Sequence, residues 1–135
     1  MLNVTADTNI LISATIVCGK EFYFLSLARQ RRFNLYLSLA IIEECFKVLL
    51  RPKFGFSNEQ VLRSIKHILS ISTIVIPTRS ISIIKDDPSD NRILECAASS
   101  NSDYIVSGDH HLLHVKGFDG IRIITTTEFL RILKQ

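Results

Sequence analysis

Four acidic residues, spread along the whole chain, are the side chains that could do chemistry together: Asp7, Glu44, Asp90 and Asp109. Carboxylate oxygens are the ligands that Mg²⁺ and Mn²⁺ prefer in proteins, whereas zinc sites draw mainly on His and Cys. Two carboxylates repel each other by about 4 kcal/mol at a separation of roughly 4 Å and an effective dielectric of about 20. If the fold brings all four together, we expect them to bind one or two divalent metal ions.

Asp7 and Asp109 each come after a predicted strand. Residues 2–6 are typical of a buried strand that Asp7 closes, and Asp109 follows a second strand predicted over 103–106. In an open parallel sheet, functional groups gather beyond the carboxyl ends of the strands. Both carboxylates are therefore predicted at the same edge, although Asp7 could also be a turn residue and Asp109 a helix cap.

Asp90 lies in the first turn of a helix predicted to begin at Ser89 or Asp90 and to end near Ser99. It is in line with the inward-facing positions 93, 94 and 97 of that helix. Burying an unpaired carboxylate is costly, so such a position implies a cation, a metal or backbone amides as a partner. Helix capping is the other interpretation; together with the other three acids, a ligand role is favoured.

Glu43 and Glu44 are adjacent but face different directions on a helix predicted over 38–50. Glu43 is four residues before Lys47, a spacing typical of a solvated ion pair. Glu44 borders the apolar stripe, one turn from Ile41 and Val48. We therefore choose Glu44 as the candidate ligand, with a charge at the edge of the stripe as the alternative.

Strands and helices alternate along the chain. Strands are predicted over 2–6, 33–37, 73–77, 103–106 and 121–124, and helices over 8–17, 21–32, 38–50, 57–70 and 89–99, followed by a C-terminal helix capped by Thr125 and Glu128. The strands are short and rich in Ile and Val, as expected when helices cover both faces of a parallel sheet. The predicted fold is α/β, a three-layer α/β/α sandwich with a central parallel sheet of four to five strands, and residues 1–135 form a single domain.

Composition is that of a compact unit able to bury a core. The chain has 135 residues, of which 47% are hydrophobic and 21% charged, and its formal net charge is +3. The longest apolar stretches are far shorter than the roughly 20 residues that a membrane span needs, and the N-terminus does not resemble a signal peptide. We expect a cytoplasmic protein without membrane contact, whose isolated Cys18, Cys45 and Cys96 are reduced core thiols.

Basic residues could contact a phosphate backbone, although solvated surface charges are the other interpretation. The candidate substrate contacts are Arg51, Lys53 and Arg92, with Arg79, Lys85 and Lys116 as further candidates and Phe54 or Phe56 as a stacking face. His110 and His114 are four residues apart and could bind a transition metal, but a surface or capping role is favoured. Asp86, Asp87 and Asp119 lie in turn-like surroundings and are interpreted as loop residues.

Four motifs resemble those of PIN-domain nucleases, in the order in which that family carries them. The first is Val4-Thr5-Ala6-Asp7-Thr8-Asn9, and the second runs from Ser38 to Phe54 with Glu44 and Arg51-Pro52-Lys53-Phe54. The third is Asp87-Pro88-Ser89-Asp90-Asn91, and the fourth runs from Asp103 to Asp109 through Ser107-Gly108. The likeness covers nearly the whole chain, and its second motif is similar to that of PIN proteins acting as toxins of toxin-antitoxin pairs.

The resemblance implies a metal-dependent ribonuclease that acts on single-stranded RNA, with Asp7, Glu44, Asp90 and Asp109 as its acidic quartet. Asn9 and Ser107 match polar positions that help to orient the acids or the attacking water in this family. Mg²⁺ or Mn²⁺, as one or two ions, is the implied cofactor. The implied partners are an RNA substrate, a small antitoxin that covers the acidic site, and a second copy of the chain in a homodimer.

Three other classes of protein could carry acids at this edge. A phosphatase with an aspartate nucleophile typically has a second Asp two residues after the first, whereas position 9 is Asn. A phospho-receiver domain has a pair of adjacent acids after its first strand, which this chain lacks. A catalytically silent PIN fold that only binds RNA or protein stays open as the alternative function.

Overall fold

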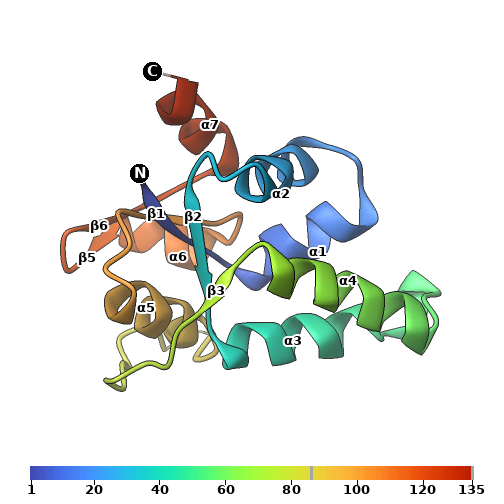
Figure 1. Ribbon diagram of the computed structural model, residues 1–135. Helices are drawn as coiled ribbons and strands as arrows, with labels where there is room; N and C mark the ends of the chain where they lie inside the picture. The colour runs from blue at the N-terminus through green and yellow to red at the C-terminus, as the bar shows by residue number, and fades with distance from the viewer. Residues whose placement is uncertain (86, 135) are drawn as a thin grey trace.

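The computed structural model describes residues 1–85 and 87–134. Within them a single sheet runs through the molecule in the strand order β3-β2-β1-β4-β6-β5 (Figure 1). The strands are β1 (Asn3–Ala6), β2 (Asn34–Leu37), β3 (Thr73–Ile74), β4 (Tyr104–Val106), β5 (Gly117–Phe118) and β6 (Ile121–Ile124). All neighbouring pairs are parallel except β5 and β6, so the carboxyl ends of the central strands share one edge.

Helices cover both faces of this sheet, which confirms the predicted three-layer α/β arrangement. They are α1 (Thr8–Ile16), α2 (Lys20–Arg29), α3 (Leu39–Leu49), the 3₁₀ helix η1 (Pro52–Phe54), α4 (Asn58–Ser70), α5 (Asp90–Ser99), α6 (His110–Val115) and α7 (Thr126–Lys134). Helix α5 packs on β1, β2 and β4, and α6 packs on β6; α2 contacts α1 and α7. Helix α3 contacts both α1 and α5, which places it across the carboxyl edge of the sheet.

Local sequence signals set several helix boundaries. Ser57 accepts a hydrogen bond from the amide of Gln60 at 3.1 Å and its own amide donates to the Gln60 side chain at 2.8 Å, forming the expected capping box of α4. Thr125 and Glu128 form the same reciprocal pair before α7. Helix α3 ends at Leu49, before Pro52, which lacks the amide hydrogen needed to continue a helix.

The sheet has six strands in the described residues and is not entirely parallel, so the prediction of a parallel sheet of four to five strands was wrong in these two details. The additional strand is β5, which pairs antiparallel with β6 across Asp119 and Gly120. Both of these residues have positive φ, 52° and 79°, as a two-residue hairpin turn requires. An Asp-Gly pair is a known hairpin signal, and interpreting Asp119 only as a loop residue missed it.

An aromatic cluster joins the ends of the chain in the core. The rings of Phe24, Phe33 and Phe129 are all buried and lie 5.0 to 5.5 Å apart between centroids, in tilted and edge-to-face contacts. Such contacts favour the approach of α2 and α7 beyond the area they bury. The cluster therefore anchors the C-terminal helix to the body of the domain.

Two of the three cysteines lie in the core as expected. Cys45 and Cys96 are buried, and burial raises the pKa of each thiol to about 12. Cys18 is exposed after the end of α1, so its prediction as a core thiol was wrong. Its apolar neighbours Ile16 and Val17 are exposed too, because α1 ends at Ile16 and the chain turns there toward α2.

In the part of the chain that the structure describes, no single helix is long and apolar enough to cross a membrane. Helices α1 and α2 reach the length and apolar composition of a membrane span only when they are taken together, and the two are bent by 102° relative to each other.

Candidate metal centre

The four predicted acids meet at the carboxyl edge of the sheet, each contributed by a different segment. They line one small pocket of about 80 Å³. Its walls are Asp7, Thr8, Asn9, Glu44, Asp87, Asp90, Ile93 and Asp109. We call it the acidic pocket. The parallel strands explain the convergence, since β1 and β4 are neighbours that end at the same edge, and α3 and α5 contact each other.

Asp7 is fixed where β1 passes directly into α1. One carboxylate oxygen caps the helix by accepting from the amide of Ile10 at 3.0 Å, and the other accepts the hydroxyl hydrogen of Ser107. Only 3% of the residue is exposed. Burial raises the pKa of this carboxyl to about 6, although both hydrogen bonds oppose the shift by stabilising the ionised form.

Ser107 connects the acids of β1 and β4. While its hydroxyl donates to Asp7, its oxygen accepts from the amide of Asp109 at 2.9 Å. Asp109 in turn caps α6, accepting from the amide of His111 at 2.7 Å. The side chain of Asp109 therefore combines the two roles predicted for it: it caps α6, and it lines the acidic pocket.

Asp90 is the acid whose surroundings demand a cation most clearly. It lies in the first turn of α5 and is 8% exposed, and its Oδ2 is buried without a hydrogen-bond partner among the described residues. Burial, followed by the negative charges of Asp109 and Asp87, raises its pKa to about 7. Ser89 rather than Asp90 is the capping residue of α5, and it makes no side-chain cap. The side chain of Asp90 is thus not used as a helix cap.

Asp87 belongs to the pocket, although it was predicted as a loop residue at the start of the third motif and not as a metal ligand. It is in the loop before α5, but its carboxylate lines the acidic pocket beside Asp90 and Asp109. One of its oxygens accepts from the amide and the hydroxyl of Ser89, at 3.2 and 2.6 Å. Its place in the third motif was visible in the sequence, but nothing there indicated the direction of its side chain. Asp86, interpreted in the same way, lies outside the described residues.

Glu44 contributes to the pocket from α3. It is half-buried and accepts from the hydroxyl of Thr8 at 3.3 Å, whereas Glu43 is exposed. Asn9 is exposed at the mouth of the same pocket. The helical phase explains the difference between the two glutamates, since consecutive helix positions point about 100° apart.

The three predicted substrate contacts lie outside the acidic pocket. Arg51 and Lys53 are exposed at η1, where the ammonium of Lys53 is 5.1 Å from the ring centroid of Phe54. Arg92 is committed to Glu95, with two N···O distances of 2.9 Å, and also donates to the backbone oxygen of Ile81 at 3.2 Å. Their contact with a substrate stays a prediction.

The donor set fits a hard divalent cation. One oxygen from each of Asp87, Asp90 and Asp109 lies within 4.8 Å of the other two. Among the residues that the structure describes, neither a His nor a Cys lines the pocket. An all-oxygen site of several carboxylates suits Mg²⁺ or Mn²⁺ better than zinc. A cation among these oxygens would give the Oδ2 of Asp90 the partner that no other described residue supplies.

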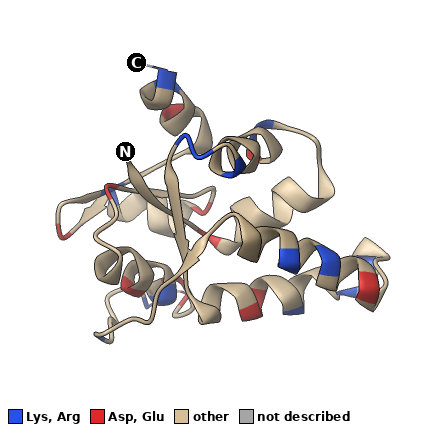
Figure 2. Ribbon diagram, viewed as in Figure 1, with Lys and Arg blue, Asp and Glu red and all other residues tan. Residues whose placement is uncertain are grey.

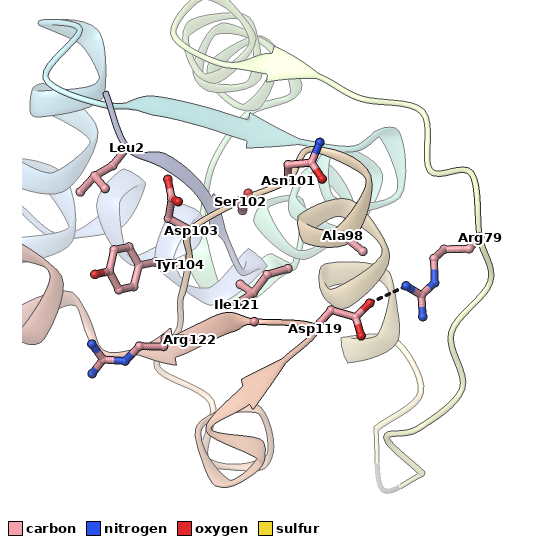
Figure 3. Close-up of a pocket in the computed structure, with 11 residues that line it drawn as sticks. Leu2, Arg79, Ala98, Asn101, Ser102, Asp103, Tyr104, Asp119, Ile121 and Arg122 are labelled. Atoms are coloured by element: carbon pink, nitrogen blue, oxygen red, sulfur yellow. Dashed lines mark hydrogen bonds and ion pairs between the residues drawn. The ribbon is translucent and has the colours of Figure 1, made fainter.

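A larger pocket, of about 650 Å³, lies at the opposite edge of the sheet, where β1, β4 and β6 begin (Figure 3). Its charged groups already have partners: Asp119 pairs with Arg79, and Asp103 accepts from the amide of Asn3 at 2.8 Å. The guanidinium of Arg122 is 5.8 Å from the centroid of Tyr104. Size alone therefore does not identify the site, because the unsatisfied acids are at the other edge.

Comparisons with known proteins follow the same lines. A family model for the PIN domain matches residues 3–111. Among solved structures, the crystal structure of PAE2754 from Pyrobaculum aerophilum is similar with a TM-score of 0.69 and 18% sequence identity, over 99% of this chain and 91% of that one. At this low sequence identity, the structural similarity shows only that the two proteins share a fold. No curated protein sequence is a significant match.

Proposed function

The chain belongs to the PIN-domain family, and from this membership and the acidic pocket we propose that it is a Mg²⁺- or Mn²⁺-dependent endoribonuclease that hydrolyses phosphodiester bonds of single-stranded RNA. The family has a nuclease-type fold. The observation that carries the proposal is the buried, unpartnered Oδ2 of Asp90 beside the carboxylates of Asp87 and Asp109. A protein without need of a cation gains nothing from this arrangement, because it destabilises the ionised acids.

The position of each residue in the acidic pocket indicates its proposed role in the reaction. Asp87, Asp90 and Asp109 present the closely spaced oxygens that would bind the ion, and Asp7 and Glu44 complete the acidic wall. A bound divalent ion supplies positive charge that activates water at neutral pH and stabilises the leaving oxygen of a phosphodiester. Ser107 holds the Asp7 carboxylate in one orientation, and Asn9 offers an amide at the mouth of the pocket.

The raised pKa values describe the resting state of the pocket. With pKa values of about 6 for Asp7 and about 7 for Asp90, the two side chains hold part of their protons near neutral pH. Sharing protons relieves the repulsion among the acids in the absence of a cation. Divalent ions and protons therefore compete for the same oxygens, and activity should fall as the pH is lowered through this range.

We extend the proposal to partners. A small antitoxin whose segment covers the acidic pocket would hold the enzyme inactive in the cytoplasm, and a basic side chain of that segment could pair with the carboxylates.

A homodimer, in which a second copy of the chain is the partner, is supported by the exposed aromatic rings of α2, where Phe22 and Tyr23 are 50% and 49% exposed. Light scattering of the purified protein, alone and with Phe22→Ser, tests the homodimer; a wild-type monomer contradicts it.

The test of the proposed activity is cleavage of an end-labelled single-stranded RNA in Mn²⁺, Mg²⁺ or EDTA. We expect metal-dependent cutting by the wild type and none by Asp7→Asn, which removes one charge and almost no volume. Asp119→Asn is the matched control, because it removes the same charge from an exposed ion pair at the other edge of the sheet. A cleavage rate that is equal in wild type and Asp7→Asn would identify a contaminating ribonuclease. RNA binding without any cleavage would favour the catalytically silent binding module.

A further inference from the structure

We propose that a groove beside the acidic pocket binds the nucleotide adjoining the cleaved phosphate; this rests on the proposed ribonuclease activity. The groove has a volume of about 510 Å³ and is lined chiefly by Ile83, Lys85, His110, His111 and His114. We call it the histidine groove. Its residues have no part in the acid cluster; Lys85 was predicted as a further candidate phosphate contact, and a surface or capping role was favoured for His110 and His114.

The groove lies next to the acidic pocket along the chain, because the same two segments contribute residues to both. The loop before α5 gives Lys85 to the groove and Asp87 to the pocket, two residues further on. On the other side, Asp109 lines the pocket and His110, the next residue, lines the groove. A strand of RNA with one phosphate at the carboxylates would therefore enter the groove with its next nucleotide.

The acidic pocket and the histidine groove differ in volume, and this difference assigns them different roles in binding RNA. The acidic pocket, at about 80 Å³, has room for an ion and part of a phosphate group but not for a nucleoside. The histidine groove, at about 510 Å³, is in the range of pockets that hold small organic ligands, and a single nucleotide is of that size. The base and ribose next to the cleaved bond must lie outside the acidic pocket, and the groove is the adjoining space.

The two cavities also differ in the charge of the side chains that line them. The described residues that line the groove include one lysine and three histidines, and none of these described residues is an acid. Lys85 and His114 are exposed, so the ammonium and an imidazole N–H can donate to phosphate oxygens. The acidic pocket needs a cation before it can accept a phosphate, whereas the groove attracts the neighbouring phosphate with its own side chains.

The groove also offers flat and apolar surfaces for a base. The rings of His110 and His111 contact each other in a tilted arrangement, with 4.1 Å between centroids and 38° between the ring planes. Ile83, which lines the same groove, is 53% exposed although it is a large apolar residue. Stacking on such rings is sequence-tolerant, as recognition of single strands usually is. The chemistry of the groove therefore suits an unpaired nucleotide rather than a duplex.

The test compares two double variants, each of which replaces one lysine and one histidine by glutamine, at two different places in the structure. Lys85→Gln with His114→Gln changes the histidine groove. Lys66→Gln with His67→Gln changes exposed residues of α4, one of the helices that carry the basic residues in Figure 2, and these line neither the groove nor the acidic pocket. Binding of a fluorescein-labelled single-stranded RNA is measured by anisotropy in Ca²⁺, and cleavage of the same RNA in Mn²⁺.

We expect the groove variant to raise both Kd and KM about tenfold, with kcat and the Mn²⁺ concentration for half-maximal activity unchanged. The control variant should bind and cleave as the wild type does. An unchanged Kd and KM in the groove variant, or an equal rise in the control, would overturn the groove. If the wild type binds RNA but does not cleave it, the ribonuclease proposal fails, and the anisotropy comparison still decides whether the groove holds the RNA.

Discussion

Replacing Asp90 by Asn should make the metal-free protein more stable at alkaline pH. The carboxylate of Asp90 is buried with one oxygen unpartnered, and its pKa rises from 3.8 to about 7 in the fold. A carboxyl with a raised pKa keeps its proton longer in the folded than in the unfolded chain. Its ionisation therefore removes stability as the pH rises from about 4 to about 7, and Asn, which does not ionise, escapes this loss.

The size of the effect follows from the shift. Each pKa unit corresponds to about 1.36 kcal/mol, so ionised Asp90 lowers the free energy of unfolding by about 4 kcal/mol at pH 8. At pH 5 the same relation gives roughly 1 to 2 kcal/mol, because only the unfolded chain has lost the proton. The stability advantage of the Asn variant should therefore grow by roughly 2 to 3 kcal/mol between pH 5 and pH 8.

Urea unfolding in EDTA at both pH values measures this difference. Asp7 titrates in the same window but is present in both proteins, so its contribution largely cancels. Asp119→Asn is the control, since its carboxylate is exposed and paired with Arg79, and it should show no such growth with pH. A difference between Asp90→Asn and wild type that is the same at pH 5 and pH 8 would refute the reasoning. Adding Mn²⁺ should reverse the order at pH 8 by stabilising the wild type.

Three further outcomes are expected. Glu44→Gln should weaken Mn²⁺-dependent cleavage at least tenfold while Glu43→Gln leaves it unchanged, because only Glu44 lines the acidic pocket; metal titrations of the cleavage rate check this. Ser107→Ala should raise the pKa of Asp7 above about 6, since the hydroxyl lowers it, and move the acidic limb of the pH–rate profile to higher pH; an unshifted limb would contradict it. Phe129→Ala should cost about 3 to 5 kcal/mol in urea unfolding, as loss of a buried aromatic ring does, with no change in the metal dependence of the remaining activity.

The placement of the central acids could be predicted because it depends on topology. Asp7 closes a strand and Asp109 follows another, and parallel pairing of those strands brings both to one edge whatever the exact packing. Glu44 could be separated from Glu43 by helical phase alone. Periodicity is the strongest signal in a single sequence, so the residues that depend only on it were placed well.

Asp87 could not be placed in the same way. It lies in an irregular loop, where no period indicates the direction of a side chain. The loop is held by Asn91, whose side chain accepts from the amide of Ile84 at 2.9 Å and donates to its carbonyl at 2.8 Å. These contacts form between residues seven apart, and no propensity or spacing rule predicts them. The participation of Asp87 in the site is therefore a result of tertiary structure.

The errors at Cys18 and at the sheet edge have different causes. Cys18 follows apolar residues, and apolar composition was taken as burial, yet the helix ends at Ile16 and leaves this turn exposed. The hairpin of β5 and β6 was missed because β5 has only two residues, too short for an alternating pattern, although Asp119-Gly120 signalled the turn. The ion pair of Arg92 with Glu95 was also missed, although the two residues are three apart on one helix, a spacing that favours such a pair.

Calorimetric titration of Mn²⁺ into the metal-free protein tests the central claim most directly. The account predicts saturable binding near neutral pH with release of protons, because Asp7 and Asp90 have pKa values of about 6 and about 7 and must ionise to bind the ion. Asp90→Asn should lose most of this affinity, and Asp119→Asn should retain it. Absence of binding in the wild type, or equal binding in all three proteins, would contradict the assignment of the acidic pocket as a metal centre.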